Sequence, residues 1–223
     1  MTRPVVPSTV AYADDFIVTG RSKEFLEQKV RPFIEAFLAE RGLALSAEKT
    51  RATAIEEGFD FLGINIRRVG SKLLTRPAQK GIQSLCSKLR EIVKGNASAK
   101  QINVIRQLNP VIRGWAQYHR HGVASEAFGK VDSYLWLLLW RWAKRRHNNK
   151  GARWIKAKYF RRIRHRDWIF AANENEGTKE FVALVKASDT LIRRHLKIQS
   201  AANPFDPEWH DYFARRQYRR FRD

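Results

Sequence analysis

The sequence predicts an α+β protein, with antiparallel β-hairpins and one helix in its N-terminal third and helices in most of the remainder. Short runs of β-branched and aromatic residues, separated by acidic or glycine-containing turns, fill the first part of the chain. After Pro77, apolar residues recur at the three-and-four spacing of amphipathic helices. The distribution of charge divides the chain into a near-neutral first part and a strongly basic second part.

The 223 residues carry a formal net charge of +21, which is spread unevenly. Residues 1–60 hold 8 basic and 10 acidic side chains, whereas residues 61–223 hold 35 basic and 12 acidic ones. Such an excess favours a polyanionic partner, nucleic acid first and an anionic membrane surface second. The simpler alternative is a set of solvated basic helix faces. We prefer nucleic acid because cations at this density repel one another without a counter-polyanion.

Cysteine usage and hydropathy exclude other classes of protein. The single cysteine, Cys86, cannot form an intramolecular disulfide or a cysteine-rich zinc site. It lies on an expected helix, where we expect it to be a small buried apolar residue. The first nine residues contain no apolar signal segment. The most apolar window, residues 134–142, is about half of the roughly 20 residues that a membrane-spanning helix needs. We therefore expect a cytoplasmic protein with no membrane partner.

The N-terminal third is expected to form β-hairpins around one helix. The sequence Ala13-Asp14-Asp15 lies between two β-rich runs and predicts a hairpin with acidic residues at its tip. A helix is expected from Ser22 to Glu40, because its apolar residues recur at helical spacing and Gly42 can end it. The predicted strands are residues 10–12, 16–18, 50–55 and 59–69.

Three long helices are expected after Pro77, over residues 78–94, 98–119 and 125–146. Gly95-Asn96 and Gly122 separate them. Pro110 should bend or break the second helix near Asn109, because proline lacks the amide hydrogen that a helix interior uses. Short helices and loops are expected from residue 151 onward, ending in an arginine-rich tail.

The acidic hairpin is the clearest chemical feature. Adjacent carboxylates repel each other unless a cation lies between them, so Asp14 and Asp15 are candidate ligands of a divalent ion. Mg²⁺ suits them, because it is often bound by one or two carboxylates together with substrate phosphates. Such ions stabilise the attacking and leaving oxygens in nucleotidyl transfer. The alternative is an ordinary solvated turn.

Four ordered motifs connect this hairpin to a known family. Tyr12-Ala13-Asp14-Asp15 resembles the YADD box of reverse transcriptases. Residues 45–50, LSAEKT, resemble the next palm motif, and residues 59–63, FDFLG, resemble the motif at the palm–thumb junction. Residues 108–115, LNPVIRGW, followed by Tyr118-His119, resemble the maturase-specific domain, also called domain X or thumb. Together they resemble the C-terminal part of a group II intron-encoded reverse transcriptase/maturase.

The resemblance implies a domain order and site roles. We expect a partial reverse transcriptase palm at residues 1–76, an all-helical maturase-specific domain at residues 77–170, and a basic C-terminal extension at residues 171–223. By resemblance, Asp14 and Asp15 are the catalytic, Mg²⁺-binding residues, and Lys49 contacts the template or nucleotide phosphates. Tyr12, Ala13 and Gly63 complete the palm motifs.

The departures from the family pattern limit the expected activity. The fingers and a third metal-binding aspartate precede the YADD box in the family, whereas only 13 residues precede Asp14 here and none is acidic. Ala11 replaces a usual basic residue. We therefore expect no autonomous RNA-directed DNA polymerase activity, and expect instead binding of group II intron RNA and assistance of its splicing. The alternatives are half of a split polymerase that needs a separate fingers–palm fragment, and a non-functional remnant of a mobile genetic element. A DNA target or an RNA–DNA duplex stays open as a further partner.

The basic body supplies candidate RNA contacts. The segment from Arg141 to Arg166 has 12 Lys or Arg residues and no acidic one. Lysine and arginine give affinity by neutralising phosphates, and aromatic rings interleaved with them can stack on unpaired bases. The candidate RNA-binding residues are Arg113, Trp115, Tyr118, His119, Arg141, Lys144, Arg145, Arg146, Lys150, Arg153, Lys156, Lys158, Arg161 and Arg162.

Some aromatic and histidine residues have a simpler interpretation. Trp136, Leu137 and Trp140 lie at helical spacing and are more typical of a bundle core than of an RNA contact. Trp154 and Tyr159 lie among charges and fit either role. No pair of histidines has convincing metal-ligand spacing with cysteine or acidic residues, so we expect the histidines to face RNA or the core.

Overall fold

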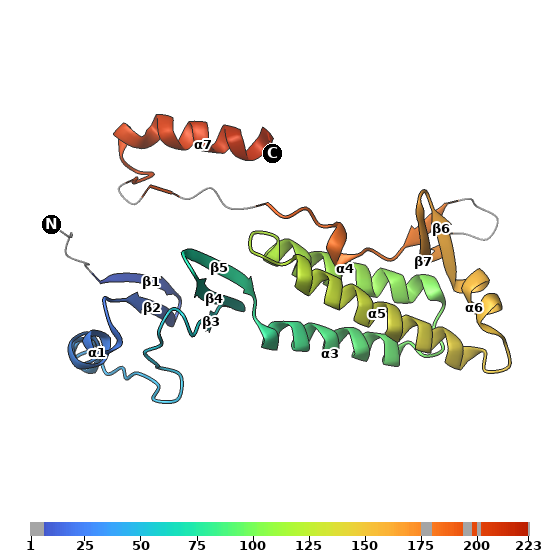
Figure 1. Ribbon diagram of the computed structural model, residues 1–223, viewed down its shortest axis with the longest axis horizontal. Coiled ribbons are helices and arrows are strands. Elements are labelled where there is room, and N and C mark those ends of the chain that lie inside the picture. The colour runs from blue at the N-terminus through green and yellow to red at the C-terminus, as the bar shows by residue number, and fades with distance from the viewer. Residues whose placement is uncertain (1–6, 175–179, 194–197, 200–201, 223) are drawn as a thin grey trace. The chain divides into compact units, whose positions relative to one another are not determined.

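A computed structural model describes residues 7–174, 180–193, 198–199 and 202–222, and it confirms the α+β class. The chain divides into two compact units (Figure 1). The first comprises the residues up to Phe61 together with Ile66–Leu74, and the second comprises Leu62–Asn65 together with the residues from Thr75 onward.

The first unit begins with the expected hairpin. Strands β1 (Ser8–Tyr12) and β2 (Asp15–Thr19) pair antiparallel, with Tyr12 opposite Asp15. The predicted single helix is a short α1 (Lys23–Phe25), a π-helical turn η1 (Leu26–Val30) and α2 (Arg31–Ala39) in direct succession. The Ser22 hydroxyl begins it by accepting a hydrogen bond from the amide of Phe25 at 3.1 Å. None of the described residues before Pro77 is buried.

A second β-region precedes the long helices in the sequence. Strands β3 (Phe59–Phe61), β4 (Ile64–Val69) and β5 (Lys72–Pro77) form a sheet in that order. The predicted strand at residues 50–55 is wrong, because this segment is a loop and turn, although the Ile55 carbonyl does accept a hydrogen bond from the amide of Arg68 at 2.8 Å. The predicted strand at residues 59–69 is interrupted by a turn at Leu62-Gly63.

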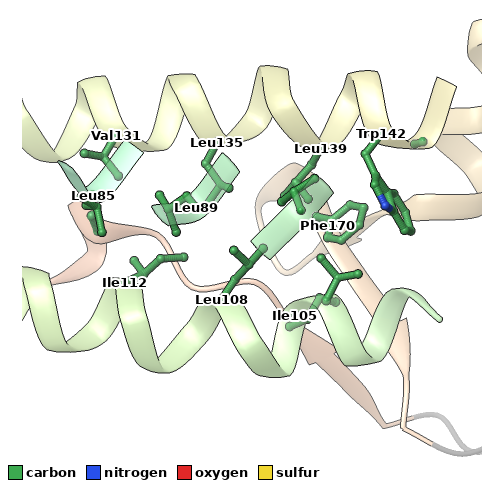
Figure 2. Packing of buried hydrophobic residues seen from close by; sticks show 14 of the residues in the cluster. Leu85, Leu89, Ile105, Leu108, Ile112, Val131, Leu135, Leu139, Trp142 and Phe170 are labelled. Carbon is green, nitrogen blue, oxygen red and sulfur yellow. The ribbon is translucent and has the colours of Figure 1, made fainter. Parts of the chain in front are cut away.

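The core of the second unit is a bundle of three helices that closely match the expected ones. Helices α3 (Gln79–Gly95), α4 (Gln101–His119) and α5 (Ser125–Arg146) lie side by side (Figure 1). Figure 2 shows how their apolar side chains meet, with Leu89 of α3, Leu108 of α4 and Leu139 of α5 each fully buried. Full burial of such a side chain stabilises the fold by about 1.5–3 kcal/mol, so the bundle is the rigid part of this unit.

Pro110 does not break α4, which is continuous from Gln101 to His119. The proline is exposed. The side chain of its neighbour Asn109, only 7% exposed, donates to the Ala183 carbonyl at 3.0 Å and accepts from the Val185 amide at 2.9 Å. The Asn-Pro pair therefore marks a point where α4 holds a distant segment of the chain.

The region expected to be all-helical also contains strands. After α6 (Ala152–Tyr159), strands β6 (Phe160–Ile163), β7 (Arg166–Asn173) and β8 (Phe181–Ala183) form a sheet in that order. Phe160 and Phe170 of this sheet belong to the same core cluster as the three long helices. Their aromatic side chains are buried by contacts with residues distant in sequence, and such contacts leave no local helical or alternating pattern.

Further along the chain, the 3₁₀ turns η2 (Ala187–Asp189) and η3 (Pro207–Trp209) precede the arginine-rich helix α7 (His210–Arg222). The Asp132 carboxylate of α5 accepts hydrogen bonds from the amides of Ala187 at 2.7 Å and Ser188 at 3.1 Å, which fixes η2 to the bundle. Within the described ranges, no helix is both long and apolar enough to cross a bilayer.

Candidate nucleic-acid interface

The acidic hairpin has a strained turn. Ala13 and Asp14 form its two-residue loop, and Ala13 adopts a φ of 51°. An L-residue with a side chain in this left-handed region costs about 1–2 kcal/mol, so alanine is an unfavourable choice at this position. The turn places Asp14 at the tip and Asp15 at the first position of β2, with both side chains exposed.

The donor set of this turn fits a hard divalent ion only in part. Asp14 and Asp15 supply two exposed carboxylates that form no ion pair within the described part of the chain. Such groups are the ligands that Mg²⁺ takes from proteins. Among the described residues, no group of three or more His, Cys, Asp or Glu side chains is placed to hold a metal ion. Asp14 and Asp15 could therefore contribute to a magnesium site but do not complete one.

The other palm-motif residues fall in separate places. Tyr12 ends β1 and is 65% exposed, and Lys49 is an exposed residue in a turn whose amide donates to the Ser46 carbonyl at 3.2 Å. Gly63 adopts a φ of 74° in the turn before β4, with open space where a Cβ would stand. The glycine is therefore needed for its backbone conformation.

The Leu62-Gly63 turn is tied to the helical bundle through its carbonyl groups. The hydroxyl of Tyr118 on α4 donates to the Leu62 carbonyl at 2.6 Å, and the Ala78 amide donates to the Gly63 carbonyl at 2.9 Å. Tyr118, predicted to contact RNA, thus has a structural hydrogen bond although it is 54% exposed. Its ring packs edge-on against His119, with 4.8 Å between the ring centroids.

The structure packs two of the predicted RNA contacts against the core. His119 is only 6% exposed, so its ring belongs to the core, and this burial lowers the pKa of its imidazole. Trp115 is half-buried between His119 and Phe128, at centroid distances of 4.8 and 5.5 Å. Both residues lie on the inward face of α4, which the sequence motif alone did not distinguish from the outward face carrying Arg113.

Two of the predicted cations have structural partners. Arg146 donates to the carbonyls of Ala97 and Ala99 at 2.7 and 2.9 Å and lies over the ring of Trp142, so it closes the loop before α4. Half-buried Arg161 donates to the Ala157 carbonyl at 3.0 Å. These guanidinium groups position the chain and are less available to phosphates.

With the exception of Arg113, which is exposed on α4, the other predicted cations form the basic surface at one end of the bundle, where α5 ends and α6 begins (Figure 1). Apart from half-buried Lys156, which pairs with Asp167 at 2.8 Å, they are exposed and have no acidic partner within the described ranges. Uncompensated cations on a rigid scaffold create a positive potential that attracts phosphates. The exposed members of this basic surface are Arg141, Lys144, Arg145, Lys150, Arg153, Lys158 and Arg162.

Trp154 lies within this basic surface and is 40% exposed. The ammonium groups of Lys150 and Lys158 lie 5.8 and 4.9 Å from the Trp154 ring centroid, and His147 contacts the ring edge-on at 4.7 Å. Partial burial, followed by the positive charges of Lys158, Arg146 and Lys150, lowers the pKa of His147. Cations therefore dominate the electrostatics here.

Two of the histidines lie next to oxygen atoms of the protein. His147 lies 2.7 Å from the Tyr159 hydroxyl, and His121 lies 2.7 Å from the Arg193 carbonyl. Tyr159 itself is buried, which decides its role in favour of the core. Cys86 is half-buried, and burial raises the pKa of its thiol.

Sequence reasoning missed the exposure of Trp136 and Leu137 on α5, whereas Trp140 packs against the core as expected. Trp136 and Leu137 were expected in the core but are 37% and 46% exposed, whereas Leu135 and Leu139 face inward. Helical spacing predicts that residues share a face but does not say which face is covered. It also missed Asn109 and Asp132, whose side chains hold residues 183–188; the available signal was the position of Asp132 just before the most apolar window of the sequence, residues 134–142.

Comparison with known proteins agrees with this arrangement. A reverse transcriptase (RNA-dependent DNA polymerase) family model matches residues 6–66, which contain the acidic hairpin and extend into β4. A model of the group II intron maturase-specific domain matches residues 82–160, from α3 through α6. No curated protein matches the chain. The two matches follow each other in the order that the sequence motifs predicted, and the chain therefore carries part of a reverse transcriptase domain followed by a group II intron maturase-specific domain.

Proposed function

We propose that this protein binds group II intron RNA through the basic surface of its maturase-specific domain and assists splicing of that RNA. The observation that carries the proposal is the set of exposed cations without acidic partners at the junction of α5 and α6, within and next to the segment that the maturase model matches. Each phosphate that such a cation neutralises releases condensed counterions, which favours binding.

The rigidity of the bundle supports a role in RNA folding beyond simple adhesion. The cations of α5 project from a helix whose Leu135, Leu139 and Ala143 are fully or almost fully buried. Charges held on a rigid scaffold favour the RNA shape whose phosphates match them, and disfavour shapes that do not. Selective binding of the splicing-competent fold would shift the RNA population toward that fold.

DNA synthesis by this chain alone is not part of the proposal. Asp14 and Asp15 would hold the divalent ion, which when bound stabilises charge on the oxygens in nucleotidyl transfer. The hairpin that carries them has no buried residue, and no third carboxylate is placed beside it among the described residues. We propose that this pair becomes functional only if another polypeptide supplies the remaining ligand and the template-binding surface.

A filter-binding titration across a salt series tests the RNA proposal. The full chain is compared on a group II intron RNA and an unrelated RNA of equal length. We expect tighter binding to the intron that persists at elevated salt, and faster splicing of the intron when the protein is added at low Mg²⁺. Equal affinities with the same steep salt dependence would show a basic surface without shape recognition and would contradict a maturase role.

The exposed apolar residues of the first unit favour a second candidate, half of a split polymerase. Val10, Tyr12 and Phe16 of the hairpin are 59%, 65% and 38% exposed, and Phe33 of α2 is 73% exposed. Val10 and Tyr12 alternate along β1 and so share one face of the hairpin, and exposed apolar side chains that share a face are typical of protein interfaces. Mixing the chain with a fingers–palm fragment that carries the third aspartate should then restore primer extension. Failure of the mixture, or activity that survives Asp14→Asn, would exclude this candidate.

A further inference from the structure

Four aromatic rings gather beside the basic surface, on α5, β6 and β7. Trp136 and Trp140 are stacked nearly parallel, at 3° and with 5.9 Å between centroids. The ring of Trp168 meets both of these rings edge-on, with 5.9 and 5.7 Å between centroids. The ring of Phe160 packs against Trp168, with 5.6 Å between centroids. We call Trp136, Trp140, Phe160 and Trp168 the aromatic platform.

A β-bulge holds Trp168 in the aromatic platform. Arg161 is opposite Ile169 and Ile163 is opposite Arg166, so two residues of β7, Asp167 and Trp168, face one residue of β6. Trp168 adopts a φ of 60°, which is rare for a bulky residue. Bulges of this kind re-aim a side chain, and strained backbone often marks a functional position.

The bulge is fixed by Asp167. Its carboxylate accepts hydrogen bonds from the Trp168 amide at 2.9 Å and from Lys156 Nζ at 2.8 Å, and the same ammonium lies 4.5 Å from the Trp168 ring centroid. Lys156 therefore neutralises the carboxylate that precedes Trp168 in the sequence.

The aromatic platform is open to solvent and has a basic rim. Trp136 and Trp168 are each 37% exposed, although neighbouring Phe160 is only 4% exposed. Lys144 lies one helical turn beyond Trp140 on the same face of α5. Arg162 is close enough to Asp167 to help lower its pKa, after the hydrogen bonds from Lys156 and the Trp168 amide. Neither Lys144 nor Arg162 forms an ion pair within the described ranges.

We infer that the aromatic platform binds an unpaired RNA base, which stacks on one of the two exposed indoles, Trp136 or Trp168, and meets the other edge-on, while Lys144 and Arg162 contact the adjoining phosphates. This inference rests on the proposed RNA-binding function and adds a stacking site for a single-stranded segment. Exposed rings bordered by uncompensated cations match a strand that presents bases and phosphates in alternation. An apolar protein partner would gain nothing from the cationic rim.

Fluorescence anisotropy of the full chain with two labelled strands tests the inference. One strand is an unstructured uridine oligonucleotide, and the other is an abasic ribose-phosphate strand of equal length and charge. We expect the wild-type protein to bind the uridine strand about tenfold more tightly, since stacking on one aromatic site is worth about that factor or more.

The variants isolate the indoles. In Trp136→Leu with Trp168→Asn, this preference should disappear while affinity for the abasic strand is unchanged; asparagine tolerates the positive φ of position 168. Trp136→Phe keeps a stacking ring and should retain most of the preference, which protects the test if the double variant folds poorly. Leu137→Ala, an exposed change on the same helix, serves as the matched control and should keep the full preference.

The outcomes separate the two hypotheses. Equal binding of both strands by the wild type, or an undiminished preference in the folded double variant, would overturn the stacking site and leave the basic surface in place. If neither these strands nor intron RNA binds, the proposed function itself is wrong.

Discussion

Replacing Lys144, Arg145 and Lys150 by glutamine removes three exposed cations of the basic surface that have no acidic partner within the described ranges. The logarithm of the binding constant falls linearly with the logarithm of the salt concentration, and each phosphate contact contributes about 0.7 to this slope for single strands and about 0.9 for a DNA duplex. Loss of three contacts should therefore reduce the slope by about 2–3. If the contacts act only through counterion release, affinity at 0.1 M salt should fall about 100- to 500-fold.

The fold should tolerate this change. Lys144 and Arg145 lie in the last turn of α5, where a cation interacts favourably with the helix dipole by about 0.3–1 kcal/mol at most. The matched control replaces Lys88, Arg90 and Lys94 of α3 by glutamine, which removes the same charge from exposed positions outside the basic surface. Filter binding to intron RNA over a salt series, with urea denaturation of each protein, gives the required measurements.

Two results would refute the reasoning. Equal losses in the two triple variants would mean that net charge alone governs binding. An unchanged salt slope in the Lys144, Arg145 and Lys150 variant would mean that these cations do not contact phosphates.

Three further predictions concern stability. Asn109→Ala leaves the carbonyl of residue 183 and the amide of residue 185 unpaired, and should destabilise the second unit by about 2–4 kcal/mol in urea denaturation. The control Asn103→Ala, at an exposed position, should change the free energy of unfolding by less than about 0.5 kcal/mol. Burial lowers the pKa of His119 in the folded state, so the free energy of unfolding should fall as pH drops below about 6.5. His119→Gln should flatten this pH dependence, and an unaltered pH profile in the variant would contradict the role of His119. Ala13→Gly relieves a positive φ and should stabilise the hairpin by up to about 1 kcal/mol, seen as slower amide exchange; faster exchange would contradict the strain argument.

Local patterns predicted the elements that depend on local physics. The apolar spacing of α3, α4 and α5 placed these helices closely, because each buries one face along its whole length. The hairpin at Asp14-Asp15 was also predicted, since alternating strands on either side of a short turn form a local structure.

Predictions failed where distant contacts decide the conformation. Residues 50–55 have strand-like composition but no strand partner along their length, and strand propensity is effective only in a sheet. The segment that contains β6 and β7 was expected to be helical. It forms strands because Phe160 and Phe170 complete a core built by the long helices. Pro110 was expected to interrupt α4, which continues through it.

By itself the sequence determined the α+β class, the three-helix bundle, the acidic hairpin, the basic character of the second part and the family. Only the tertiary structure decided which side chains are available. It buried His119, engaged Arg146 with the carbonyls of Ala97 and Ala99, and exposed Trp136. The physical reason is that charge, periodicity and motif order are properties of neighbouring residues, whereas the availability of a side chain depends on what distant segments place against it.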